Sequence, residues 1–240
     1  MTMNRATVLA AIVASAAIAL WLLRPSAPAY TPTPDPRAYL QFAFEGNLDT
    51  LAPTPVEASV IDGDLVYGEG TTGQTFAAQG DGSALVITTR DLYDLAEVVE
   101  ITLDFRPEAW TNPHKGSAAV QTMVVLSGRS GEKLRHLTID LPAHTSPEFR
   151  VTFEDIEGAK HTLTTPAADF ELEWHNVRIR ANRASGRTEV FLNGTSIGTL
   201  EALPSGITHG IDTIKLGTWF RQNQAFRGQI DNLIIRDASS

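Results

Sequence analysis

The segment from Trp174 to Gly198 constrains the fold more than any other part of the chain. Within His175–Ala181, the apolar residues Val177, Ile179 and Ala181 fall on one face and polar residues fall on the other. This period of two is typical of a half-buried antiparallel β-strand, in which successive side chains point to opposite faces.

Two turn signals divide this segment. Ala-Ser-Gly at 184–186 turns the chain, and the alternation returns over Thr188–Leu192. Asn193-Gly194 supplies the two positive-φ positions of a type I′ hairpin turn. Ser196–Leu200 then returns as a third strand. Three consecutive antiparallel strands predict a β-sandwich.

Short apolar or alternating segments recur along the chain, separated by turns rich in glycine and polar residues. Many short strands and no convincing amphipathic helix predict an all-β fold, a two-sheet antiparallel jelly-roll sandwich over 39–240. The further expected strands are Leu40–Phe44, Leu65–Tyr67, Gln74–Ala78, Ala84–Thr88, Glu100–Arg106, Val120–Leu126, Leu134–Leu141, Phe149–Phe153, His161–Thr164, Thr213–Trp219 and Gln229–Arg236.

The composition excludes several classes of function. The chain has 240 residues, no cysteine and a formal net charge of -9. Without cysteine there is no disulfide framework, thiolate metal site or cysteine nucleophile. A nucleic-acid partner is not expected, because the chain has no surplus of positive charge to displace phosphate counterions.

The N-terminal residues 1–24 contain a long uncharged, mostly apolar segment. The run Ala6–Leu23 has no charge, lies between Arg5 and Arg24, and as a helix spans roughly 27 Å, close to the thickness of a bilayer core. We expect a single transmembrane anchor whose membrane-facing residues include Leu9, Ile12, Val13, Ile18, Leu20, Trp21 and Leu22.

A cleaved signal peptide is the alternative, because Ala27-Pro28-Ala29 resembles an A-x-A cleavage site. Residues 25–38 contain five prolines and predict an extended linker. With a transmembrane anchor at 1–24, we expect the protein in the cytoplasmic (inner) membrane, with its globular domain in the periplasm or outside.

Four segments, taken together, resemble the laminin-G-like branch of the concanavalin A-like lectin/glucanase superfamily. Their order and spacing carry the resemblance, which covers about Leu40–Asp237 and implies a jelly-roll sandwich without implying an activity. The segments are Phe42–Asp49, Val99–Pro107, Trp174–Val177 with Val190–Gly194, and Ile214–Gly217 with Phe226–Leu233.

The resemblance also implies a possible structural calcium ion, since family members often hold one between the first and last strands. The matching oxygen donors are Asn47, Asp49 and Asp231, and such oxygens suit Ca²⁺. The alternative is that Asn47 and Asp49 form a turn while Asp231 accepts hydrogen bonds from backbone amides.

Glycoside hydrolases of this superfamily carry two glutamates around an aspartate on one strand. The nearest match is Phe153–Glu157, but Phe153 stands where the first glutamate would be needed. We therefore interpret this segment as a polar turn and do not expect an enzyme.

Large side chains in two expected loops are candidates for contact with a ligand or partner. These are Trp110 in one loop, and Trp219, Phe220 and Arg221 in the other. Aromatic rings can stack on sugars or anchor a protein partner, and ordinary packing is the alternative.

Two functions remain open. The main hypothesis is a non-catalytic, membrane-anchored accessory subunit that docks on and stabilises a membrane protein complex. The alternative is a carbohydrate-binding, lectin-like module of the cell envelope.

Overall fold

The computed structural model describes residues 31–89, 92, 95–110, 120–128, 134–142, 148–155, 158–167, 171–201, 210–218 and 225–239. From Pro32 onward these residues belong to one compact unit. They contain strands and no helix, so no helix among them is long and apolar enough to cross a membrane. The expected anchor at 1–24 lies outside the described residues.

The first sheet has eight strands in the order β13-β12-β11-β6-β15-β4-β3, with β1 also paired to β15. Its strands are β1 (Ala38–Phe42), β3 (Tyr67–Glu69), β4 (Gln74–Gln79), β6 (Val98–Pro107), β11 (His175–Asn182), β12 (Arg187–Leu192), β13 (Thr195–Leu200) and β15 (Arg227–Asp237).

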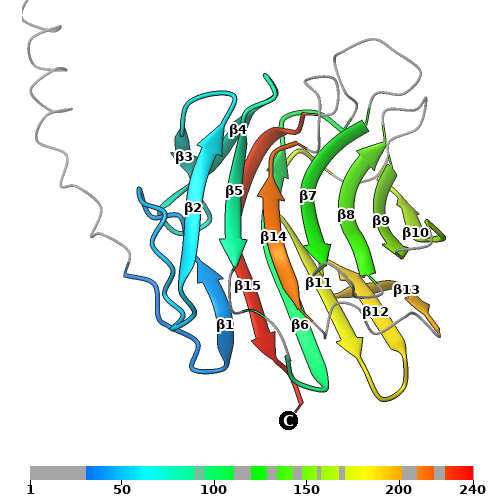
Figure 1. Ribbon diagram of the computed structural model, residues 1–240. Helices are drawn as coiled ribbons and strands as arrows, with labels where there is room; N and C mark the ends of the chain where they lie inside the picture. The colour runs from blue at the N-terminus through cyan, green and yellow to red at the C-terminus, as the bar shows by residue number, and fades with distance from the viewer. Residues whose placement is uncertain are drawn as a thin grey trace, which may run out of the picture. The chain divides into compact units, whose positions relative to one another are not determined.

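The second sheet has seven strands in the order β10-β9-β8-β7-β14-β5-β2. Its strands are β2 (Val56–Ile61), β5 (Ala84–Thr89), β7 (Val120–Gly128), β8 (Leu134–Pro142), β9 (Glu148–Asp155), β10 (Lys160–Pro166) and β14 (Ile211–Leu216). Figure 1 shows the two sheets as layers, one in front of the other.

Strand pairing is antiparallel throughout both sheets in the described residues. This confirms the all-β prediction, and two antiparallel sheets fit the expected jelly-roll sandwich. Strand β15 organises the eight-stranded sheet, because it pairs with β6 along one side and with β4 and then β1 along the other.

The core fills the space between the sheets with alternate residues of each strand. On β8, Leu137, Ile139 and Leu141 are fully buried, and on β6 Leu103 and Phe105 are as well. Rings from both sheets meet there: Phe105 on β6 stacks on Phe149 of β9 with their centroids 5.9 Å apart. Burying such side chains supplies the main driving force for folding.

The two sheets approach each other closely where β10 and β13 meet. A Cβ added to Gly198 on β13 would lie 2.8 Å from Cδ2 of Leu163 on β10. Gly198 also has a φ of 149°, a backbone conformation that other residues rarely adopt, so glycine is favoured at this contact between the edges of the two sheets.

The β12–β13 turn forms as the sequence predicts. Asn193 and Gly194 have φ values of 51° and 77°. The Asn193 side chain adds two hydrogen bonds: its Oδ1 accepts from the Asn176 amide at 2.9 Å, and its Nδ2 donates to His175 Nδ1 at 2.9 Å. The turn is thereby joined to the start of β11.

The chain segments that precede β1 and end β15 lie next to each other. The Asp237 amide donates to the carbonyl of Arg37 at 3.0 Å. Arg236 on β15 donates to Asp35 at 3.0 Å and also pairs with Glu100 on β6. These contacts attach the end of the proline-rich segment to the eight-stranded sheet.

The structure differs from the expected strands in several places. Strand β1 ends at Phe42, because Phe44, expected to belong to it, has a φ of 52°. Strand β2 was not expected, although its residues alternate between half-buried and exposed. Strand β3 begins at Tyr67, where a strand over Leu65–Tyr67 was expected, and β14 ends at Leu216. Gly217, at a φ of 99°, takes a conformation outside the extended range of a strand, so the chain turns there.

Asn193→Gly is expected to lower the free energy of unfolding by about 1–2 kcal/mol. Glycine keeps the positive φ, so the loss comes from the two side-chain hydrogen bonds and from the greater freedom of glycine in the unfolded chain. Urea denaturation followed by circular dichroism measures it. The matched control is Gly194→Asn. Its side chain would extend into open space, and asparagine tolerates positive φ, so the free energy of unfolding should change little. Equal stabilities for Asn193→Gly and the parent would contradict the assignment.

Candidate functional site

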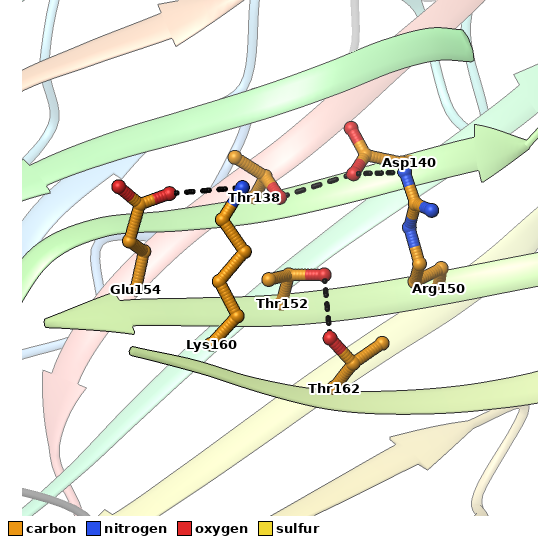
Figure 2. A pocket seen from close by; sticks show the side chains of 7 residues that line it. All are labelled: Thr138, Asp140, Arg150, Thr152, Glu154, Lys160 and Thr162. Carbon is orange, nitrogen blue, oxygen red and sulfur yellow. Dashed lines mark hydrogen bonds and ion pairs between the residues drawn. The ribbon is translucent and has the colours of Figure 1, made fainter. Parts of the chain in front are cut away.

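A polar groove lies on the seven-stranded sheet, on the face turned away from the other sheet. Its lining side chains alternate along β8 and β9 with the core residues, so they must point outward. Its volume is about 150 Å³. We call it the β8–β10 groove (Figure 2); it is lined by Thr138, Asp140, Arg150, Thr152, Glu154, Lys160 and Thr162.

A row of three threonines crosses the middle of the groove. Thr138 on β8 is directly opposite Thr152 on β9, which is opposite Thr162 on β10. The hydroxyls of Thr152 and Thr162 are 3.3 Å apart and share one hydrogen bond. Each hydroxyl can both donate and accept, so the row offers both kinds of hydrogen bond.

An ion pair closes one end of this row. Oδ2 of Asp140 accepts from Arg150 Nη2 at 3.2 Å and from the Thr138 hydroxyl at 3.0 Å. The Asp140 side chain is only 5% exposed. Its Oδ1 and the Nε of Arg150 are buried and have no hydrogen-bond partner within the described part of the chain. Buried polar atoms are usually paired, and unpaired ones are found at functional positions.

A second ion pair lies at the other end. Lys160 Nζ on β10 is 3.3 Å from Glu154 Oε2 on β9, and Figure 2 shows the two pairs on either side of the threonines. The lysine is more than half exposed while the glutamate is mostly buried, so water screens this pair more than the other.

Burial raises the pKa of Asp140 above its ordinary value of 3.8, against the opposing effects of the Arg150 charge and of the Thr122 and Thr138 hydroxyls. The cost of removing the carboxylate from water therefore outweighs its partners. A buried charge that weakens the fold is a feature that functional sites often carry.

The residues expected to bind calcium have other hydrogen-bonding roles. Asn47 Oδ1 accepts from the Asp49 amide at 2.9 Å, which closes a turn. Asp231 Oδ2 accepts from the amide and hydroxyl of Thr71, each at 3.0 Å. Among the described residues no cluster of carboxylates and histidines could hold a metal ion. The expected calcium ion at Asn47, Asp49 and Asp231 therefore remains a prediction.

Trp110 is not in the groove. Trp110 is 8% exposed and packs on His175 and Phe105, with ring centroids 5.2 and 6.2 Å away. A ring so buried offers a ligand little surface. The residues Trp219, Phe220 and Arg221, like the expected membrane residues of 1–24, lie outside the described residues.

The groove residues were not among the candidates predicted from the sequence. Glu154 was included in an expected polar turn, but β9 continues to Asp155. The signal that could have found the site is a polar residue at every second position of three consecutive strands: Thr138 and Asp140, then Arg150, Thr152 and Glu154, then Lys160 and Thr162.

Neither a family model nor a curated protein matches the chain. Similar solved structures include the receptor binding domain of botulinum neurotoxin D, at 14% identity and a TM-score of 0.61, covering 83% of this chain and 49% of that one. The binding domain of serotype G has 11% identity and a TM-score of 0.61, covering 82% and 47%.

A third similar structure is the serotype D ligand binding domain in complex with N-acetylneuraminic acid. It has 13% identity and a TM-score of 0.61, covering 83% of this chain and 47% of that chain. The chain thus spans about half the length of these solved chains. At such low identity the similarity shows a shared β-sandwich fold, and it does not by itself show a shared function.

Asp140→Asn is expected to raise the melting temperature at pH 7 by about 2–4 °C, the shift that about 1 kcal/mol produces in a chain of this size. Asparagine resembles the neutral carboxyl group that burial favours. Thermal unfolding followed by circular dichroism measures the change.

The matched control for that experiment is Asp81→Asn, which is expected to act in the opposite direction. The Ser83 hydroxyl and amide donate to Asp81 and lower its pKa, so its charged form stabilises the fold. A lower melting temperature for Asp140→Asn would contradict the unfavourable burial of its charge.

Stability is also expected to pass through a maximum as the pH falls from about 7 to about 3. Burial raises the pKa of Asp140 and of Asp231, so the folded chain takes up protons before the unfolded chain does, and the free energy of unfolding rises. Below about pH 3.8 the free energy of unfolding falls again. In this range Asp35, Asp81 and Asp237, whose pKa values are lowered by hydrogen bonds, become protonated.

Urea denaturation at a series of pH values measures this profile. The Asp140→Asn variant should show a smaller rise between neutral and mildly acidic pH. A monotonic loss of stability from neutral pH downward would contradict the expectation.

Proposed function

We propose that the sandwich is a non-catalytic glycan-binding module and that the β8–β10 groove is its binding surface. The observation that supports this most is the groove itself: three hydroxyls between two ion pairs, all on one outward face of three paired strands. Groups that both donate and accept hydrogen bonds suit the hydroxyls of a sugar.

The size of the groove is consistent with this class of ligand. Pockets for drug-sized ligands usually occupy about 300–1,000 Å³, whereas this one has about 150 Å³. We therefore expect it to hold one sugar residue, or the edge of one, with the rest of the glycan in solvent. Rigid strands position the lining side chains, which reduces the ordering cost of binding.

The spacing of the groove carboxylates disfavours glycoside hydrolysis there. Asp140 is opposite Arg150 in the register, and Glu154 is four residues further along β9. Four strand residues span about 13 Å, whereas the two carboxyl groups of a glycosidase are about 5–9.5 Å apart. The Asp140–Glu154 pair therefore lies outside the range in which one group protonates the bond while the other attacks or activates water.

The structural comparisons support the glycan-binding hypothesis better than the accessory-subunit hypothesis. One similar structure contains N-acetylneuraminic acid, and others are named receptor binding domains. Docking on a membrane protein complex has no comparable support. The membrane anchor at 1–24 and the position of the sandwich outside the cytoplasmic membrane remain predictions, as does a bound calcium ion.

A glycan array probed with the full-length chain tests the proposed function, followed by calorimetric titration of the best glycan. Asp140→Asn is expected to weaken binding about tenfold, since it replaces a charged acceptor oxygen by an amide donor, and Thr162→Val about fivefold, since it removes a hydroxyl. The matched control is Thr88→Val on β5, on the same sheet but outside the groove, which should leave the affinity unchanged.

Two results would contradict the proposal. One is an array without any bound glycan. The other is a glycan whose affinity is the same for the parent, Asp140→Asn and Thr162→Val, because such a ligand would bind elsewhere on the molecule.

A further inference from the structure

We infer that the ligand of the β8–β10 groove is an uncharged glycan, recognised through its hydroxyl groups, and not an acidic one. This inference rests on the proposed function and narrows its ligand class. It separates this chain from the similar structure that contains N-acetylneuraminic acid, an acidic sugar.

The charge balance of the groove favours an uncharged ligand. Its lining contains two cationic side chains, Arg150 and Lys160, and two carboxylates, Asp140 and Glu154. Each cation is already paired with a carboxylate, at 3.2 and 3.3 Å. Within the described lining the pairs cancel, so these residues present no net charge to attract an anion, and the whole chain carries -9. An acidic glycan would meet repulsion at long range and no compensation at the site.

The floor of the groove presents hydrogen-bond acceptors. Thr138 and Asp140 are each 4% exposed and form its most buried part. The Thr138 hydroxyl uses its only proton on Asp140 Oδ2, so both side chains present acceptors. A carboxylate or sulfate group also presents only acceptors and would be opposed by them, whereas a hydroxyl brings the proton they require.

Two buried polar atoms of the Asp140–Arg150 pair have no hydrogen-bond partner among the described residues. Asp140 Oδ1 is an acceptor and Arg150 Nε is a donor. A hydroxyl can serve both, because it donates one hydrogen bond while it accepts another.

The test compares a neutral galactose-terminated glycan with the same glycan capped by N-acetylneuraminic acid, each titrated calorimetrically into the full-length chain. The neutral glycan should bind at least about tenfold more tightly. Its Kd should change by less than about twofold between about 20 and 300 mM NaCl, since an uncharged ligand is not subject to Debye screening.

A groove variant tests the charge argument directly. Glu154→Gln removes one negative charge from the groove lining and is expected to shift the ratio of the two affinities about fivefold toward the capped glycan, whatever its effect on the absolute Kd of the neutral glycan. The matched control is Glu57→Gln, an exposed position on β2 of the same sheet. It changes the net charge of the chain equally but should not alter the preference.

The possible outcomes separate this inference from the proposed function. Preference for the neutral glycan with a flat salt dependence supports both. Tighter binding of the capped glycan, with an affinity that falls steeply as salt is added, overturns the inference and leaves a glycan-binding module. Binding of neither glycan, and of no other on the array, overturns the proposed function and the inference with it.

Discussion

The apolar layer between the two sheets is the constraint on which the rest of the molecule depends. Each strand contributes every second side chain to that layer, so the residues in between must face outward. On β8 the fully buried Leu137, Ile139 and Leu141 fix the outward direction of Thr138 and Asp140. A slip of one residue in register would bury the polar set and expose the apolar one. The energetics of the core therefore also determine which side chains line the groove.

The parts of the fold that the sequence predicts are those set by local physics. The strands β11, β12 and β13 appear where alternation and turn chemistry place them, because Asn193 and Gly194 tolerate the positive φ that a tight hairpin requires. Strand β2 was missed although its alternation is visible, because its exposed edge position leaves it only half-buried and gives it a weak apolar signal.

The groove could not be predicted in the same way, since it depends on contacts between strands. Asp140 and Arg150 are opposite each other only because of the β8–β9 register, and Thr162 joins them only through the β9–β10 register. Sequence fixes which face a residue occupies once its strand is known, but the residues directly opposite depend on tertiary pairing. Trp110 is a candidate from its size and expected loop position alone. Its ring instead packs against Phe105 of β6 and His175 of β11, contacts that depend on the tertiary structure.

The proximity of the two ends of the sandwich has a consequence for how such a module can be built into larger proteins. One hydrogen bond joins Asp237 to Arg37, and Arg236 links the last strand to Asp35. The chain therefore enters and leaves the sandwich at one place on the eight-stranded sheet, whereas the β8–β10 groove is on the outer face of the other sheet. A module with this geometry can be inserted into a loop of a host protein, or extended at either end, without separating any pair of strands.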